Sequence, residues 1–310
     1  MRNTQTVFDA ATHAEQTGDS DKALRLYERA SLLYDIGKWN EAIRVARQLT
    51  KRSPNSVSAH IVIAGSYAEL GRWKMAERFY RKSLAITQEP WAWLLLGWAL
   101  DRLKRHDEAK ECLRKALKVD PDYDEAHYNL GCSYRRQGKL ALAEKHLKRA
   151  IEIDPQYALA YAELGQLLTG QKNRTKQAIS CLRTALDYNP SDGWSIAYLA
   201  NALWKLRKLK AAEAQYQRLI EVWPNESLPY WSYGDFLASE RNDRATAERY
   251  LSKAVEIEPH SAPANYYLGK YLLYRDRKED ARRCLAKAAR LGHLRARELL
   301  CDAARLRRAL

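Results

Sequence analysis

The apolar residues of this chain recur at the spacing of amphipathic helices, most plainly between Asp124 and Tyr157. Gly138 and Lys139 interrupt this pattern near its middle, and Pro155 ends it, since proline lacks an N–H and clashes inside a helix. We therefore expect two short helices joined by a turn. The apolar residues at helical spacing are Leu130, Tyr134, Leu142, Ala143, Leu147, Ala150 and Ile151.

The same pattern returns along most of the chain at a fixed period. Prolines 54, 121, 155, 190, 224 and 259 are separated by 67, 34, 35, 34 and 35 residues, and the first interval spans two units. Such a period indicates one helix-turn-helix unit in tandem, in which neighbouring units must stack to bury their apolar faces. We therefore predict an all-α fold, an α-solenoid. Position 1 of the eight units falls near Ala23, Val57, Pro90, Asp124, Ala158, Gly193, Ser227 and Ala262.

The unit resembles the tetratricopeptide repeat. That family places Leu-Gly at positions 7 and 8, an aromatic or apolar residue at 11, alanine at 20 and 27, a large apolar residue at 24 and proline at 32. His127 departs from the bulky residue that the family has at position 4. The resemblance implies a right-handed superhelix whose first helices line a concave groove. The matching residues of the fourth unit are Leu130, Gly131, Tyr134, Ala143, Leu147, Ala150 and Pro155.

Three segments make up the expected domain organisation. Residues 1–22 form an N-terminal capping helix, residues 23–292 the eight repeats, and residues 293–310 a basic C-terminal capping helix. Atypical terminal units of this kind keep a solenoid soluble. The fifth and seventh repeats carry one extra residue, in the loops Lys172–Gln177 and Arg241–Thr246.

The resemblance implies that positions 2, 5, 6, 9, 12 and 13 of each first helix face the groove. Aromatic and arginine side chains at such positions are typical of protein-binding surfaces, since they bury much area and keep a polar handle. The alternative is that several of these aromatics pack between adjacent first helices. The predicted partner-binding residues are Trp91, Trp98, Arg102, Tyr128, Asn129, Arg135, Arg136, Trp194, Tyr198, Asn201, Trp204, Lys205, Trp231, Tyr267 and Lys270. The same positions also hold Leu94, Leu95, Asp101, Glu125, Cys132, Ala197, Leu228, Ser232, Asp235, Tyr266 and Tyr274.

Positive charge is concentrated at the C-terminal end of the sequence. The sequence has 53 Lys and Arg against 38 Asp and Glu, a net charge of +15, and residues 270–310 hold 13 basic and 5 acidic residues. The predicted groove is close to neutral, which disfavours nucleic acid there, because phosphate neutralisation supplies most of that affinity. An acidic partner or nucleic acid at the basic end stays open, as does a merely solvated cap. The basic C-terminal patch comprises Arg275, Arg282, Arg283, Arg290, Arg295 and Arg297.

Motifs for catalysis were not found in the sequence. Cys112, Cys181 and Cys284 share position 23 in non-adjacent repeats, which favours buried packing thiols in a reducing compartment. His60 and His127 lack partners with ligand spacing. With no apolar signal-peptide core and no 20-residue apolar run, we expect a cytoplasmic protein without enzymatic activity, cofactor or metal. The leading hypothesis is a scaffold or adaptor within a larger complex that binds a peptide, loop or domain. The alternative is a nucleic-acid-associated protein using its basic convex face and tail.

Overall fold

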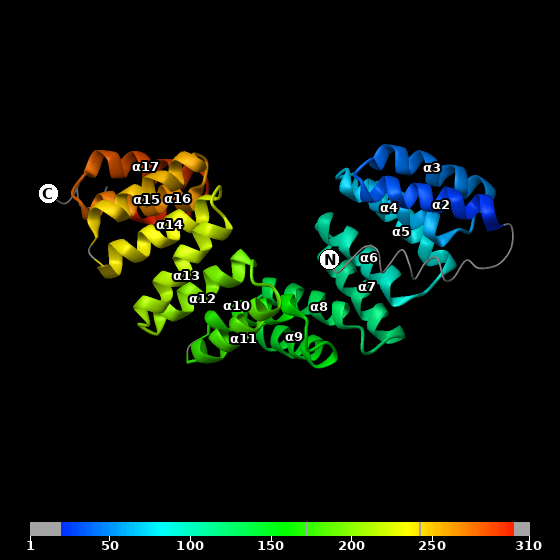
Figure 1. Ribbon diagram of the computed structural model, residues 1–310, viewed down its shortest axis with the longest axis horizontal. Coiled ribbons are helices and arrows are strands. Elements are labelled where there is room, and N and C mark those ends of the chain that lie inside the picture. The colour runs from blue at the N-terminus through cyan, green and yellow to red at the C-terminus, as the bar shows by residue number, and fades with distance from the viewer. Residues whose placement is uncertain (1–19, 172, 242, 301–310) are drawn as a thin grey trace. The chain divides into compact units, whose positions relative to one another are not determined.

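The computed structural model describes residues 20–171, 173–241 and 243–300, and within these ranges all regular structure is helical. The helices follow one another in antiparallel pairs (Figure 1). The first helices of the pairs are α2 (Ser20–Asp35), α4 (Val57–Glu69), α6 (Pro90–Arg102), α8 (Asp124–Arg136), α10 (Ala158–Thr169), α12 (Gly193–Lys205), α14 (Ser227–Phe236) and α16 (Ala262–Tyr274). The second helices are α3 (Trp39–Arg52), α5 (Trp73–Ile86), α7 (His106–Val119), α9 (Leu140–Ile153), α11 (Thr175–Tyr188), α13 (Leu209–Val222), α15 (Arg244–Ile257) and α17 (Lys278–Arg290). The predicted all-α solenoid of helix-turn-helix repeats is confirmed.

Short polar residues begin several helices by capping free backbone N–H groups. The Ser56 hydroxyl accepts a hydrogen bond from Ala59 N at 3.1 Å, and an Asp192 carboxylate oxygen accepts one from Ser195 N at 3.0 Å. Asp243 and Ser261 cap α15 and α16 in the same way. Such caps satisfy backbone donors that a helix leaves unpaired in its first turn.

Seven of the described turns between the two helices of a pair contain one left-handed residue, at position 15 except in the fifth repeat, where the extra residue shifts it to Asn173 at position 16. The backbone φ is +77° at Gly37, +70° at Gly71 and +73° at Gly138. Lys104, Asn173, Arg207 and Asp276 take the same left-handed conformation in other repeats, with φ between 59° and 65°. This conformation reverses the chain tightly, so the second helix returns along the first.

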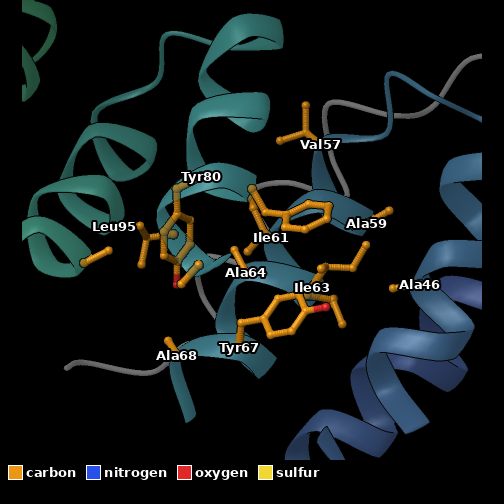
Figure 2. Packing of buried hydrophobic residues seen from close by; sticks show 14 of the residues in the cluster. Ala46, Val57, Ala59, Ile61, Ile63, Ala64, Tyr67, Ala68, Tyr80 and Leu95 are labelled. Atoms are coloured by element: carbon orange, nitrogen blue, oxygen red, sulfur yellow. The ribbon is translucent and has the colours of Figure 1, made fainter. Parts of the chain in front are cut away.

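The core is built from small residues facing larger ones across each pair. A Cβ atom placed on Gly131 would lie 2.7 Å from Leu147 Cγ, and one on Gly165 would lie 2.6 Å from Leu182 Cγ. Glycine at position 8 therefore lets the two helices of a pair approach closely. In α4 the chain places Ile61, Ile63 and Ala64 in the core with Tyr80 from α5 (Figure 2).

The described helices fall into two compact units that divide after Pro155. Unit 1 holds α2–α9 and unit 2 holds α10–α17. Each unit has its own main hydrophobic cluster, from Tyr27 to Cys112 in unit 1 and from Ile179 to Ala281 in unit 2. Within a unit, each second helix contacts its own first helix and the first helix of the next pair.

The predicted terminal helices lie wholly or partly outside the described residues. The predicted helix near the N-terminus lies outside the described residues, while residues 294–300 of the predicted C-terminal helix are helical and the rest of that segment is not described. The π-helix η1 (Leu237–Arg241) follows α14, next to the loop that carries the extra residue of the seventh repeat. None of the described helices combines the length and apolarity that bilayer crossing requires.

Candidate binding face of the first helices

We call the surface presented by the first helices of a unit its first-helix face: α4, α6 and α8 in unit 1, and α10, α12, α14 and α16 in unit 2. All of the predicted partner-binding residues lie on these helices and none of them is fully buried. Exposed are Arg102, Arg136, Trp194, Lys205 and Lys270. Half-buried are Trp91, Trp98, Tyr128, Asn129, Arg135, Tyr198, Asn201, Trp204, Trp231 and Tyr267.

Several other residues at the same helix positions are buried instead of facing the groove. Leu94, Leu95, Ala197, Ser232 and Tyr266 are each less than a tenth exposed, so their assignment to the face was wrong. The face is narrower than the positional rule implies, because neighbouring helices cover part of it. Tyr266, for example, stacks on the His293 ring at 4.0 Å between centroids.

Trp91 and Trp98 of unit 1 are partly exposed and partly packed against the core. The Trp98 ring meets the Trp73 ring of α5 edge to face, with centroids 4.9 Å apart. The Arg102 guanidinium lies over the same Trp73 ring at 4.9 Å, a cation–π contact. Trp91 is also half-buried against the core of the unit. Packing against a second helix therefore covers part of the Trp98 ring.

In unit 2 two aromatic rings stack across adjacent first helices. The Trp231 ring of α14 and the Tyr267 ring of α16 are nearly parallel at 4°, with centroids 4.7 Å apart. Lys270 Nζ donates to Asp235 Oδ1 at 2.9 Å and joins the same two helices. Burial, helped by the negative charge of Asp235, raises the pKa of Tyr267 to about 12, so its hydroxyl stays neutral. The two stacked rings form a flat aromatic surface, and the Lys270–Asp235 bond links the same two helices.

A second aromatic group lies at the start of α12. Trp194 is 53% exposed, and its ring contacts Tyr198 at 6.4 Å and the Trp223 ring at 5.4 Å between centroids. Trp223 sits over Gly193, where a Cβ atom would come within 2.3 Å of the indole. The sequence analysis missed Trp223, although its place directly before Pro224 puts it in the loop that meets the start of α12.

Trp204 is held in place by a carboxylate. Its Nε1 donates to Glu240 Oε1 at 2.8 Å, and Arg207 Nη1 donates to the same oxygen at 2.6 Å. The hydrogen bond from Trp204, followed by that from Arg207, lowers the pKa of Glu240. The Trp204 ring also meets Phe236 edge to face at 5.5 Å. The indole N–H is therefore engaged within unit 2.

Three of the predicted cations also bond to an adjacent first helix. Arg136 Nη1 of α8 lies 3.1 Å from Asp101 Oδ2 of α6, Lys205 Nζ donates to Thr169 O at 2.8 Å, and Lys270 bonds to Asp235. The Arg136–Asp101 and Lys270–Asp235 bonds are exposed, and each adds at most about 1 kcal/mol to stability, whereas the Lys205–Thr169 bond is partly buried. A ligand that binds these cations has to compete with these hydrogen bonds.

The two predicted asparagines bond within their own helices. Asn129 Nδ2 donates to Glu125 O at 2.7 Å and Asn201 Nδ2 donates to Ala197 O at 3.1 Å. Asn201 Oδ1 also accepts a hydrogen bond from Tyr216 at 2.9 Å. One amide N–H on each side chain therefore already has a partner, which reduces its capacity to hold an extended peptide backbone.

All six residues of the basic C-terminal patch are exposed. Arg283 pairs with Asp280, and Arg290 and Arg297 donate to backbone carbonyls at 3.4 Å and 3.2 Å. Arg275, Arg282 and Arg295 form no ion pair within the described part of the chain. This end of unit 2 therefore carries uncompensated positive charge.

The described cysteines are free thiols, and burial raises the pKa of Cys112 to about 11, so it is a poor nucleophile at neutral pH. Cys301 lies outside the described residues. Across the three described ranges, no three His, Cys, Asp or Glu side chains come together as metal ligands would.

A family model described as "Tetratricopeptide repeat" matches residues 27–89, 94–158, 164–221 and 198–263. The chain belongs to the tetratricopeptide repeat family. Among curated proteins it is 30% identical over 220 residues to human "Protein O-mannosyl-transferase TMTC1", a match that covers 70% of this chain. The match spans about a quarter of that relative's length, 25%.

Solved structures of tetratricopeptide repeat type share the fold. The "APC/C hetero-tetramer Cut9-Hcn1" structure matches with a TM-score of 0.68 at 19% identity, covering 86% of this chain and 52% of that one. The Pseudomonas aeruginosa pilF structure matches with a TM-score of 0.61 at 22% identity, covering 74% of this chain and 100% of that one. A repeat protein from Cytophaga hutchinsonii matches with a TM-score of 0.56 at 19% identity, covering 78% and 99%.

Proposed function

We propose that the chain is a non-catalytic interaction scaffold that binds a peptide, loop or domain of a partner protein on its first-helix face. The observation that carries this proposal is the Trp231–Tyr267 stack in unit 2, braced by the Lys270–Asp235 bond. Half-buried aromatics fixed in this way bury partner surface with little loss of side-chain freedom. Trp194 and Tyr198 on α12 add an exposed aromatic group to the same face.

The contribution of the face can be tested by removing these rings. Trp194→Ala, Trp231→Ala and Tyr267→Ala combined should abolish recovery of proteins that co-purify with the tagged chain from its own cells, measured by quantitative mass spectrometry. Arg183→Ala with Lys210→Ala, at exposed positions of the second helices α11 and α13, is the matched control and should leave recovery unchanged. Equal recovery by the two sets of variants would exclude the first-helix face as the binding surface.

A second candidate function is association with nucleic acid at the basic C-terminal patch. Arg275, Arg282 and Arg295 favour it, since they are exposed and form no ion pair with a described residue. Affinity carried by phosphate contacts falls steeply with salt, by roughly 10³-fold or more between 50 and 200 mM for six contacts. Binding of duplex DNA and of single-stranded RNA should therefore be titrated against salt, and a flat salt dependence would exclude this function.

The relative's name contains a transferase activity, which we do not propose for this chain. We assign the helix pairs to a binding scaffold, and the chain spans a quarter of that relative's length. Incubation of the purified chain with a mannosyl donor and acceptor peptides tests this directly. Turnover above a no-protein control would overturn the non-catalytic assignment.

A further inference from the structure

An open hollow of about 530 Å³ in unit 1 carries an unusual charge. Its wall is mainly α3, completed by Tyr67 of α4 and by Arg72 in the turn before α5. Four lining residues are basic, namely Arg44, Arg47, Lys51 and Arg72, and none of the lining residues is acidic. We call this the α3 hollow. It lies on the second-helix side of the repeats, away from the first-helix face.

In two other repeats, a pair of carboxylates neutralises an arginine at position 16. Arg105 Nη1 of the third repeat lies 2.8 Å from Glu77 at position 21 of the preceding repeat, and its Nη2 lies 2.5 Å from Glu108 at position 19 of its own. Arg277 of the eighth repeat bonds in the same way to Glu248 at 2.6 Å and Asp280 at 2.7 Å.

At Arg72, the residue at position 16 of the second repeat, both carboxylates are missing. Ile43 stands at the position of Glu77, and Met75 stands at the position of Glu108. No ion pair within the described ranges involves Arg72. In the third and eighth repeats this arrangement holds internal ion pairs, whereas in the second repeat it leaves the Arg72 guanidinium available.

Arg47, at position 25 of the first repeat, also lacks the acidic neighbour that the corresponding arginine of the third repeat has. Arg47 donates to the Tyr67 hydroxyl at 2.7 Å, just as Arg114 two repeats later donates to Tyr134 at 3.3 Å. Arg114 also pairs with Glu111, three residues before it, whereas Arg44 occupies that place beside Arg47. Figure 2 shows Tyr67 reaching from α4 towards α3, the helix of Ala46. The tyrosine orients the Arg47 guanidinium without neutralising it.

The basic residues of the α3 hollow, which lack the acidic neighbours found in other repeats, fit a phosphoryl group best. An arginine fork matches the planar spacing of carboxylate and phosphate oxygens, and a phosphoryl group brings nearly two negative charges and three acceptor oxygens. An adjoining hollow of about 530 Å³ shares Arg47 and is lined by Pro54, Phe79 and Ile86 among others, where an apolar side chain would fit. A basic pocket that can bind an anion, beside a hollow with apolar side chains, suits a peptide, whereas nucleic acid requires a longer basic track.

We propose that the α3 hollow binds a phosphorylated serine or threonine side chain of a partner protein. The test uses a fluorescein-labelled nonapeptide of alanine and glycine with one phosphoserine and a leucine two residues after it. Its binding to the full chain is followed by fluorescence anisotropy, beside the same peptide with serine or glutamate and a nine-nucleotide oligouridine. The phosphopeptide should bind at least about tenfold tighter than the serine peptide, because charge-assisted hydrogen bonds are involved.

Arg44→Glu is the decisive variant, because it gives Arg47 the partner that Glu111 gives Arg114. It should weaken phosphopeptide binding about tenfold or more, through loss of one cation and competition for another. Lys145→Glu, an exposed residue at the same position 22 of the fourth repeat, makes the same charge change and should alter affinity less than about twofold. Arg72→Gln should weaken binding as well, and it replaces Arg44→Glu as the decisive variant if circular dichroism shows the latter to be unfolded.

Three results would overturn the proposal. The first is equal affinity for the phosphorylated and serine peptides. The second is an equal loss of affinity in Arg44→Glu and Lys145→Glu, which would reflect overall charge. The third is tighter binding of oligouridine with the same dependence on Arg44, which would make the hollow a nucleic-acid site. The aromatic variants of the first-helix face should leave phosphopeptide affinity unchanged, so failure of one proposal is distinguishable from failure of the other.

Discussion

At the scale of single residues, position 15 shows how much one backbone conformation matters. Three of the described turns use glycine there, three use Lys104, Arg207 or Asp276, and the fifth repeat uses Asn173 one position later, all with a left-handed φ. In this conformation the Cβ of an L-residue crowds the following carbonyl, which costs about 1–2 kcal/mol for residues other than glycine, least for Asn and Asp. The turns with lysine and arginine therefore store strain that glycine would relieve.

We predict that Lys104→Gly raises the free energy of unfolding by about 0.5–1 kcal/mol, part of the relieved strain being offset by the greater freedom of glycine in the unfolded chain. Urea unfolding followed by circular dichroism measures this change. Arg78→Gly, at an exposed position inside α5, is the control and should lower stability by about 1 kcal/mol, since glycine is a poor helix former. A loss of stability in both variants would show that Lys104 is not strained.

The histidine at position 4 shows what the sequence could not reveal. His60 Nε2 lies 3.0 Å from Pro54 O and His127 Nε2 lies 3.1 Å from Pro121 O. Tyr230 and Asn265 donate to Pro224 O and Pro259 O from the same position. Residues of unlike shape thus perform one task, tying the first helix to the loop before it. A pattern of hydrophobicity cannot register such a shared hydrogen bond.

A histidine pair in the fourth repeat makes unit 1 sensitive to acid. His127 Nδ1 and His146 Nδ1 are 3.0 Å apart, and the His146 ring stacks on Tyr134. Burial, then the charges of His127, Lys145 and Arg114, lower the pKa of His146 from 6.5 to about 4. The unfolded chain therefore binds the proton more readily than the folded one between these values, and stability is lost as pH falls from about 6.5 to about 4.

His146→Asn removes this titration, so we predict that its melting temperature falls less than that of the wild type between pH 7 and pH 4.5. The difference corresponds to about 1 kcal/mol, after allowance for the partial exposure of the ring. His260→Asn, in an exposed loop, is the control and should follow the wild type. Parallel curves for all three proteins would show that the pair does not govern acid stability.

At the scale of helices, the contact between the two members of a pair decides how closely they approach. Where position 8 is Gly131, Gly165, Gly234 or Gly269, position 24 is leucine, and an added Cβ would lie 2.6–2.8 Å from the leucine Cγ. Of the three repeats with alanine at position 8, those with Ala64 and Ala200 have a buried tyrosine at position 24, and the first repeat, with Ala30, has Ala46 there. The two positions therefore behave as one packing unit.

Gly131→Ala should lower the free energy of unfolding by about 1–3 kcal/mol, because the methyl group overlaps Leu147 Cγ and also lies 3.3 Å from Ala143 O. Gly97→Ala is the matched control: its Cβ meets nothing closer than Ala109 O at 3.3 Å and Cys112 Cβ at 3.5 Å. It should therefore change stability much less. Denaturant unfolding of both variants checks the order, and an equal loss would contradict the packing argument.

Helix periodicity predicted the all-α solenoid because apolar spacing, Gly-containing turns and prolines all act locally. The candidate site was harder to predict, because exposure on a first helix depends on the next repeat. Leu94 and Trp91 follow the same positional rule, yet Leu94 is buried and Trp91 keeps part of its ring exposed. The links from Arg136 to Asp101 and from Trp204 to Glu240 join residues 35 and 36 positions apart, which composition does not indicate.

At the scale of the whole molecule, stability is distributed instead of centred on one core. Within each unit, adjacent repeats contact one another, and each unit has its own main hydrophobic cluster. In such an array the stability is close to a sum of repeat terms and nearest-neighbour terms. A cut after Pro155 therefore leaves the contacts between repeats within each unit intact.

We predict that residues 1–155 and residues 156–310, produced separately, are each helical and unfold cooperatively. Each half should show a melting transition of its own, because the contacts between its repeats lie within that half. Circular dichroism and calorimetry of the halves and of the full chain measure this. A cut after Tyr188, inside unit 2, is the matched control: it separates Leu182 and Leu186 from the cluster that they share with Ile196, so the C-terminal piece should unfold at a lower temperature than the 156–310 half. If instead residues 156–310 were unfolded alone while the piece starting at residue 189 folded, the division after Pro155 would not mark a unit of stability.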